Sequence, residues 1–215
     1  RSPLSTLFRY SRLFGSHVFF GRIEVHGQEH LPSEGAVILA PTHRSRWDPI
    51  LLAYAAGRKV TSRDLRYMVL LEQTQGIQGW FVRRLGGFPI DRDRPGTSSI
   101  RYSIQLLHNQ NVLVLFPEGH IIPDNQIDKI QPGVARIALQ AISNQSDLSL
   151  NIVPVSIYYQ HPTPLPMGCK VWVNIGSPLN VRDYQQNSMK IATKNLTADL
   201  KEALKNLHQR PSQLL

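Results

Sequence analysis

Short, unbroken runs of apolar residues limit the folds open to this sequence more than any other feature. The first run, Ala-Val-Ile-Leu-Ala-Pro, follows Gly35 and ends at Pro41. A run of this length without alternating polar residues predicts a strand buried on both faces. Similar runs occur at residues 67–70, 112–116 and 152–157. Strands buried on both faces need helices on both sides of their sheet, so the runs favour an α/β protein.

Segments with helical periodicity separate these runs. The predicted helices cover residues 50–56, 97–109, 132–143 and 193–210, and alternating strands are predicted at residues 22–25 and 171–175. Strands that alternate with helices predict a layered α/β domain, with a sheet of mainly parallel or mixed strands flanked by helices. The length of 215 residues suits one domain with a terminal appendage. We expect the appendage at residues 1–22 and the domain at residues 23–215.

The appendage has the composition of an interfacial helix. Residues 3–20 combine leucine and phenylalanine with Arg9 and Arg12 and contain no acidic residue. Such a segment suits an amphipathic helix at a membrane interface, with its arginines at the lipid headgroups. An ordinary helix packed on the core is the alternative. The aromatic, basic segment 79–85 is open to the same two interpretations.

The charge of the chain favours anionic partners. Lys and Arg number 24 against 15 Asp and Glu, and the excess lies mainly in the first half. Anionic lipids, phosphorylated molecules and nucleic acid all fit this charge, but a nucleic-acid binder would not explain the acidic residues at strand ends, so we expect none. No run approaches the roughly 18 apolar residues of a membrane span. The lone Cys169 suggests a reducing compartment. His26 and His30 lack a third ligand nearby, so we expect no metal.

The segment Thr-His-Arg-Ser-Arg-Trp-Asp-Pro directly follows the first apolar run. It places His43 and Asp48 in a strand-to-helix loop, where α/β sheets carry ligand sites. A loop that breaks at Asp48 can fold the carboxylate onto His43 Nδ1 and leave Nε2 free to accept a proton. The alternative is that Asp48 only caps the helix that begins at Pro49 and that His43 is a simple loop residue.

Two further polar clusters follow predicted strands. Asp91 and Arg92 end a short strand, and Glu118 and Gly119 follow the run at residues 112–116. Arg92 suits a phosphate, although an Arg-Asp surface ladder is the alternative. Glycine beside a carboxylate allows a ligand to approach the backbone. Convergence of these clusters with His43 and Asp48 would form one acid-base site that binds an anion.

Four ordered blocks resemble those of the glycerolipid acyltransferases, whose best-known members are lysophosphatidic acid acyltransferases. The blocks read T-H-R-S-x-x-D, G-G-F-P-I-D-R, F-P-E-G and I-V-P-V, and the resemblance covers about residues 23–178. It implies direct acyl transfer from an acyl thioester to a hydroxyl, without an acyl-enzyme. Acyl-CoA or acyl carrier protein would be the co-substrate, and no cofactor or metal is implied.

The resemblance also implies roles for single residues. His43 would be the general base, and Asp48 would orient it and stabilise its imidazolium. Arg92 would hold the acceptor phosphate, and Ser45 would also contribute to substrate binding. Glu118 and Gly119, in the third block, would bind the glycerol part of the acceptor. Pro154, in the fourth block, would help to shape the acyl-donor side.

The expected function is that of a membrane-associated O-acyltransferase that acylates 1-acylglycerol 3-phosphate to phosphatidic acid in phospholipid biosynthesis. We expect it at an anionic membrane surface on the cytoplasmic face, peripheral or anchored by its N-terminus. Two departures concern the acceptor: Thr42 replaces the usual asparagine, and His120-Ile121 replaces the usual threonine and arginine. Glycerol 3-phosphate or another lysolipid therefore stays open as acceptor. A hydrolase, or a non-catalytic module that binds anionic lipids, would also fit these residues.

Overall fold

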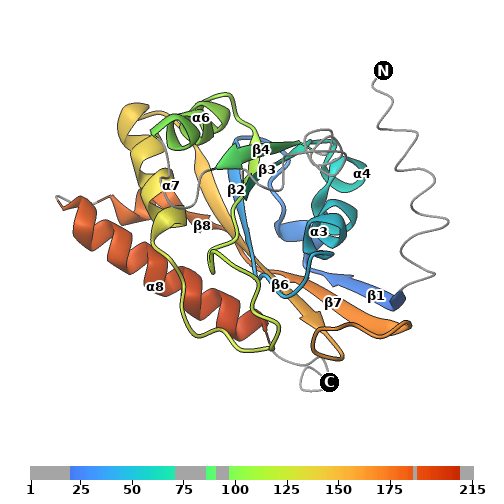
Figure 1. The fold of residues 1–215 in the computed structure, drawn as a ribbon. Helices are drawn as coiled ribbons and strands as arrows, with labels where there is room; N and C mark the ends of the chain where they lie inside the picture. Colours follow the sequence, from blue (N-terminus) through green and yellow to red (C-terminus); the bar gives the residue numbers. More distant parts are fainter. Residues whose placement is uncertain (1–19, 71–85, 91–96, 186–187, 209–215) are drawn as a thin grey trace.

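A central sheet with helices on both faces forms the body of the protein (Figure 1). The computed structural model describes residues 20–70, 86–90, 97–185 and 188–208. Its strands are β1 (Phe20–His26), β2 (Ala36–Pro41), β3 (Leu65–Leu70), β4 (Gly87–Ile90), β5 (Val112–Val114), β6 (Leu150–Tyr159), β7 (Cys169–Ile175) and β8 (Leu179–Asn180). Its helices are α3 (Asp48–Ala56), α4 (Arg58–Thr61), α6 (Thr97–His108), α7 (Gly133–Asn144) and α8 (Met189–Leu207), with short 3₁₀ turns η1 (Gln28–His30) and η3 (Val181–Tyr184).

The sheet is mainly parallel. Its strand order is β1-β7-β6-β2-β5-β3-β4, and β8 pairs with β6 off this path. The strands from β6 to β4 in this order all run parallel to one another, whereas β7 is antiparallel to β6. Ile38 lies at the centre, opposite Leu113 on one side and Ile152 on the other. The mainly parallel α/β fold predicted from the apolar runs is therefore confirmed.

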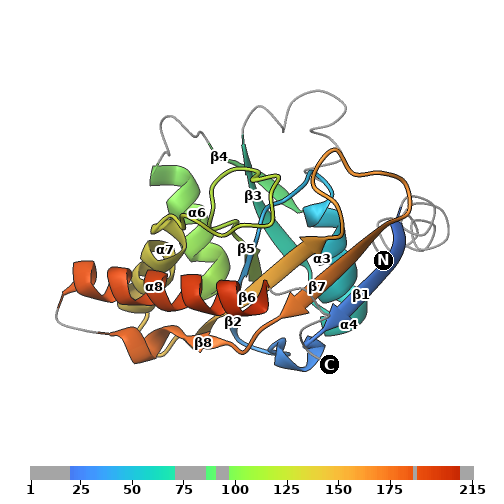
Figure 2. The same cartoon turned by 90° about the horizontal axis from the view of Figure 1, so that it is seen from below.

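Alternate residues of the central strands pack into two apolar layers. On one face, Ile38 and its neighbours pack with α6, α7 and α8, and on the other, Val37 and Leu39 pack with α3. Figures 1 and 2 show α6, α7 and α8 together on one side of the sheet and α3 on the opposite side. Every residue of β2 is buried, as its continuous apolar sequence predicts.

The parallel strands bring three chain segments together at one edge of the sheet. β2 and β5 are parallel, so the segments that follow Pro41 and Val114 leave the sheet at the same edge. β6 is also parallel to β2 and continues beyond the level of Pro41, which lies opposite Val155. The backbone N–H of Thr42 donates to the Val155 carbonyl at 2.9 Å and continues this pairing past the end of β2. The loop that carries His43 therefore starts against β6.

Several expectations fall on residues that the structure does not describe. These are the interfacial segment within residues 1–22, apart from the start of β1, the basic segment 79–85 and the charged residues after β4. The division into residues 1–22 and 23–215 therefore stays a prediction. Among the helices of the described ranges, none is both long and apolar enough to cross a bilayer.

Candidate active site

Thr42 fixes the start of the loop between β2 and α3. Its hydroxyl accepts from the Ile157 N–H at 2.9 Å and lies 3.3 Å from the Ile157 carbonyl oxygen, to which it donates. Thr42 is completely buried, and both contacts go to β6. The side chain thus extends the sheet pairing by one residue and fixes the position from which His43 leaves the sheet.

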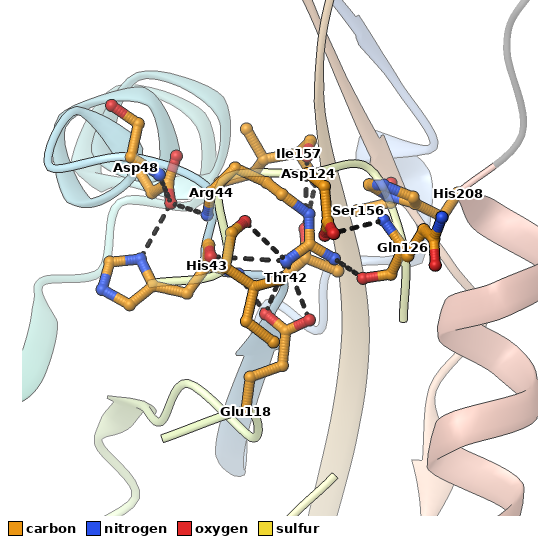
Figure 3. A network of polar contacts seen from close by, with 12 residues as sticks. Thr42, His43, Arg44, Asp48, Glu118, Asp124, Gln126, Ser156, Ile157 and His208 are labelled. Carbon is orange, nitrogen blue, oxygen red and sulfur yellow. Dashed lines mark hydrogen bonds and ion pairs between the residues drawn. The ribbon is translucent and has the colours of Figure 1, made fainter. Parts of the chain in front are cut away.

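His43 and Asp48 form the pair that the sequence predicts. Nδ1 of His43 lies 2.8 Å from Oδ2 of Asp48, whose side chain is fully buried, while the His43 side chain is 17% exposed. A carboxylate acceptor at Nδ1 selects the tautomer that carries its proton there and leaves Nε2 as an acceptor. In Figure 3 the other edge of the imidazole points away from the polar network. The free ring nitrogen is thus placed to receive a proton from a bound molecule.

The same Asp48 oxygen also closes the loop. It accepts from the backbone N–H of Arg44 at 2.6 Å and of Ser45 at 2.8 Å. We expected Asp48 to be the N-cap of the helix, but α3 begins at Asp48 itself, after Trp47, and no side chain caps it. The expected cap is therefore corrected: the carboxylate turns back to the preceding N–H groups because these lie in its own tight loop.

The backbone of His43 is held from the segment after β5. Its N–H donates to Oε2 of Glu118 at 2.6 Å, and its carbonyl accepts from the Ile122 N–H at 2.8 Å. The ring of Phe116 stacks on the imidazole, with ring centroids 4.0 Å apart and planes at 27°. The first and third sequence blocks therefore meet at His43, as their positions after parallel strands predict.

A buried ion pair lies behind this contact. Nη1 of Arg44 lies 2.8 and 2.9 Å from the two oxygens of Glu118, and both side chains are buried. The guanidinium also donates to the Gln126 carbonyl at 3.1 Å and to the Ile122 carbonyl at 3.4 Å. Burial raises the pKa of Glu118, although Arg44 and the His43 N–H act against this shift. The pair ties the loop of His43 to the segment 118–126 (Figure 3).

Glu118 lies on the inner side of the loop. We expected its carboxylate to bind the glycerol part of an acceptor; in the structure Glu118 is 1% exposed and both of its oxygens contact Arg44. The glycerol contact stays a prediction. An oxygen in this position faces protein groups on the inner side of the loop. Glu118 therefore acts on the site through the backbone of His43, and its neighbour Gly119, which is exposed, forms the outer part of the turn.

The remaining predicted site residues occupy different places. The Ser45 hydroxyl is buried and accepts from the Trp47 N–H at 3.3 Å. Pro154 is buried within β6, and its Cγ lies 3.0 Å from the point that a Cβ on Gly176 would occupy. It thus packs inside the protein, and its expected role on the acyl-donor side stays a prediction. Arg92 lies outside the described residues.

Arg44 and Tyr159 complete the site and were not found from the sequence. Tyr159 donates to Oδ1 of Asp48 at 2.6 Å from 111 residues away. Arg44 stands inside the first block, yet an arginine in a loop suggests a surface side chain. No local pattern indicates either partner. Tyr159 lies two residues beyond the strand predicted at residues 152–157, and β6 extends to it only in the structure.

His208 borders the network from the end of α8. Its Nδ1 lies 2.7 Å from the Ser156 hydroxyl on β6 (Figure 3). Burial, and to a lesser extent the charge of Arg44, lowers the pKa of His208 to about 4. The imidazole is therefore neutral at physiological pH. The last helix of the chain thus reaches the same polar network as the β2–α3 loop.

The other histidines raised by the sequence have separate contacts. His26 Nε2 lies 3.7 Å from a Glu24 oxygen, and His30 Nδ1 donates to the Ile175 carbonyl at 2.9 Å. Each side chain thus has its own partner on or beside β1 and β7. Within the described residues, no three His, Cys, Asp or Glu side chains gather as a metal site would require.

Comparison with known proteins adds a family to this geometry. The sequence model of the family described as Acyltransferase matches residues 22–158. A protein of Streptococcus pneumoniae named 1-acyl-sn-glycerol-3-phosphate acyltransferase is 31% identical over 173 residues, which cover 77% of this chain and 59% of that protein. A protein of Bacillus subtilis with the same name is 28% identical over 198 residues, 90% of this chain and 92% of that one.

A solved structure shares the fold. The crystal structure of the 1-acyl-sn-glycerophosphate acyltransferase PlsC from Thermotoga maritima is similar, with a TM-score of 0.62 and 21% identity. The similarity covers 88% of this chain and 74% of that one. At this identity the likeness concerns the α/β architecture alone.

Proposed function

The chain belongs to the acyltransferase family, and from this premise we propose that it transfers a fatty acyl group from an acyl thioester to the free hydroxyl of 1-acylglycerol 3-phosphate. The names of the relatives from S. pneumoniae and B. subtilis support this acceptor. The observation that carries the proposal is the 2.8 Å contact between His43 Nδ1 and Asp48 Oδ2, with the imidazole partly exposed.

The proposed reaction is a direct transfer. Nε2 of His43 takes the proton of the acceptor hydroxyl while the hydroxyl oxygen attacks the thioester carbonyl carbon. The new C–O bond replaces the C–S bond, and the thiolate leaves with the proton that His43 returns. Asp48 keeps the imidazole in the required tautomer and stabilises the imidazolium while it exists. Cys169 is buried on β7 and takes no part in this step.

The acceptor phosphate is assigned to the second block. Arg92 would bind it through two parallel N–H···O contacts, a geometry that suits a phosphomonoester. With Glu118 paired to Arg44, the inner side of the third block is not available to the acceptor. Its outer side presents Gly119 and His120, both of which are exposed, next to His43. In this turn His120-Ile121 stands in place of the usual threonine and arginine. This difference favours another lysolipid as the alternative acceptor.

The donor and the place of action complete the proposal. Either acyl-CoA or acyl carrier protein would supply the acyl group, and no cofactor or metal would take part. The excess of basic residues supports work at an anionic membrane surface. We assign the enzyme to the cytoplasmic face of a membrane, where lysophosphatidate is converted to phosphatidate for phospholipid biosynthesis.

The test offers labelled acyl-CoA and acyl carrier protein with a panel of acceptors in mixed micelles. The panel contains lysophosphatidate, glycerol 3-phosphate, a neutral lysolipid and a glycosylated lysolipid. We expect acylated lysophosphatidate from the unmutated chain and a loss of about 10²- to 10⁴-fold in kcat with His43→Ala. His26→Ala, at an exposed position on β1, is the control and should keep full activity. Arg92→Ala should raise the KM for lysophosphatidate more than it lowers kcat.

Other products would contradict the proposal in separable ways. Free fatty acid in place of acylated lipid would identify a hydrolase. Acylation of another acceptor alone would overturn the lysophosphatidate assignment but keep the reaction. If no thioester is consumed while the folded protein binds anionic vesicles, and His43→Ala binds equally well, the chain is a lipid-binding module.

A further inference from the structure

Tyr159 contacts the Asp48 carboxylate from outside the loop. Its hydroxyl donates to Oδ1 at 2.6 Å, whereas His43, Arg44 and Ser45 all donate to Oδ2. Donors to Oδ2 all belong to the β2–α3 loop, whereas Tyr159 ends β6 in the sheet. The carboxylate is therefore fixed on both oxygens and from two elements of the fold.

The surroundings of Tyr159 make this contact strong. The side chain is 2% exposed and packs in the apolar layer on the α3 side of the sheet, with the Phe20 ring centroid 6.2 Å away. The groups that act on its hydroxyl are Asp48, the Ser45 side chain and, more weakly, Cys169; a hydrogen bond with Ser45 acts against the effect of the other two. Burial and the Asp48 charge raise the pKa of the Tyr159 hydroxyl above its usual range, so the group stays a donor. A hydrogen bond to a carboxylate in such a site is stronger than one between neutral groups.

We propose that Tyr159 is a positioning residue for acyl transfer: its hydroxyl holds Asp48 with Oδ2 facing His43. The kinetic part of this inference rests on the proposed function. Without the hydrogen bond from Tyr159, Oδ1 of Asp48 loses its donor from the sheet. The carboxylate can then turn away from Nδ1 of His43, so it holds the imidazole and its tautomer less well.

The chain offers a matched control. Tyr67 on β3 is 5% exposed in the same apolar layer, and its hydroxyl donates to the Pro49 carbonyl at 2.9 Å. Tyr159→Phe and Tyr67→Phe each remove one buried hydroxyl whose partner lies at the start of α3. Only Tyr159 reaches the carboxylate of Asp48. A purely structural role predicts similar losses of stability in both variants and no other difference.

Two readouts separate positioning from structural support. For Tyr159→Phe we expect kcat to fall about tenfold with KM nearly unchanged. NMR of the His43 ring nitrogens in the resting protein should show a smaller share of the Nδ1–H tautomer. Tyr67→Phe should match the unmutated protein in both measurements. A folded Tyr159→Phe with unchanged kcat and an unchanged Nδ1–H share overturns the proposal.

A second variant keeps the test decisive if Tyr159→Phe does not fold. Replacement of Tyr159 by 4-fluorophenylalanine retains the ring and fills the place of the hydroxyl but donates no hydrogen bond. The Nδ1–H share of His43 should then fall as it does for Tyr159→Phe, and an unchanged share overturns the proposal. Because this NMR measurement needs no turnover, it decides the role of Tyr159 even if the unmutated chain acylates no acceptor, a result that would refute only the proposed function.

Discussion

At the scale of single residues, one oxygen atom organises the candidate active site. Oδ2 of Asp48 accepts from the His43 ring and from the N–H groups of Arg44 and Ser45. These contacts span only a few residues, which is why the spacing of His43 and Asp48 predicts the contact between those two side chains. The partners of Glu118 and Tyr159 lie 74 and 111 residues away. The order of the strands in the sheet decides which distant side chains become partners. The local sequence around His43 therefore does not predict these two contacts.

The Arg44–Glu118 pair yields a prediction that separates structural support from substrate binding. Glu118→Gln leaves the buried Arg44 without a counter-charge, and breaking a buried pair costs about 3–5 kcal/mol in unfolding free energy. We expect denaturant unfolding to show this loss, while the KM for the acceptor stays unchanged for the folded fraction. Glu24→Gln, in a partly exposed ladder with Arg22, should change stability by less than about 0.5 kcal/mol. A raised acceptor KM at unaltered stability would return Glu118 to substrate binding.

At the scale of elements, the strands are predicted better than their arrangement. The continuous run of β2 indicates burial on both faces, and the structure shows it. The alternation of β7 indicates partial burial, which holds as far as Trp172. Asn174 is buried like its neighbours, because its side chain donates to the Leu207 carbonyl. The insertion of β7 between β1 and β6, antiparallel to β6, was not predicted. Periodicity reports which face of a strand is buried but carries no information on its neighbours. The boundary of α8 also differs: it begins at Met189, before the predicted Thr193, and it ends at Leu207.

The end of α8 gives a pH-dependent prediction. His208 is buried beside Ser156, and its pKa falls from 6.5 to about 4 on folding. The unfolded chain therefore binds this proton more readily, so the stabilising contribution is complete above pH 6.5 and disappears as pH falls towards 4. The raised pKa of Glu118 acts in the opposite direction. We expect His208→Gln to lose less unfolding free energy between pH 7 and pH 5 than the unmutated protein does.

Denaturant unfolding at a series of pH values checks this expectation. His26→Gln is the control, because His26 lies at an exposed position outside the network, and its pH dependence should follow that of the unmutated protein. Identical slopes for His208→Gln and the unmutated protein would show that α8 has no proton-linked contact with the site.

At the scale of the whole molecule, the fold brings blocks from distant parts of the sequence to one edge of a sheet. β5 and β6 lie parallel to β2 on its two sides. The segment after β5 contacts His43, and Tyr159 at the end of β6 contacts Asp48. The apolar layers on the two faces fix these strands, and the polar network of Figure 3 links the loops that they carry. The chemistry therefore depends on the assembled sheet and not on the first block alone.

The central claim is that the His43–Asp48 pair performs acid-base chemistry in acyl transfer, and Asp48→Asn tests it most directly. Asparagine keeps the size of the side chain but removes the charge that selects the His43 tautomer and stabilises its imidazolium. The measurement is kcat and KM for acyl transfer to lysophosphatidate, with Asp64→Asn at an exposed pair with Arg58 as control. We expect kcat to fall about 10²- to 10⁴-fold for folded Asp48→Asn at nearly unchanged KM, and we expect no change for the control. A folded Asp48→Asn protein with the kcat of the unmutated chain would contradict the central claim.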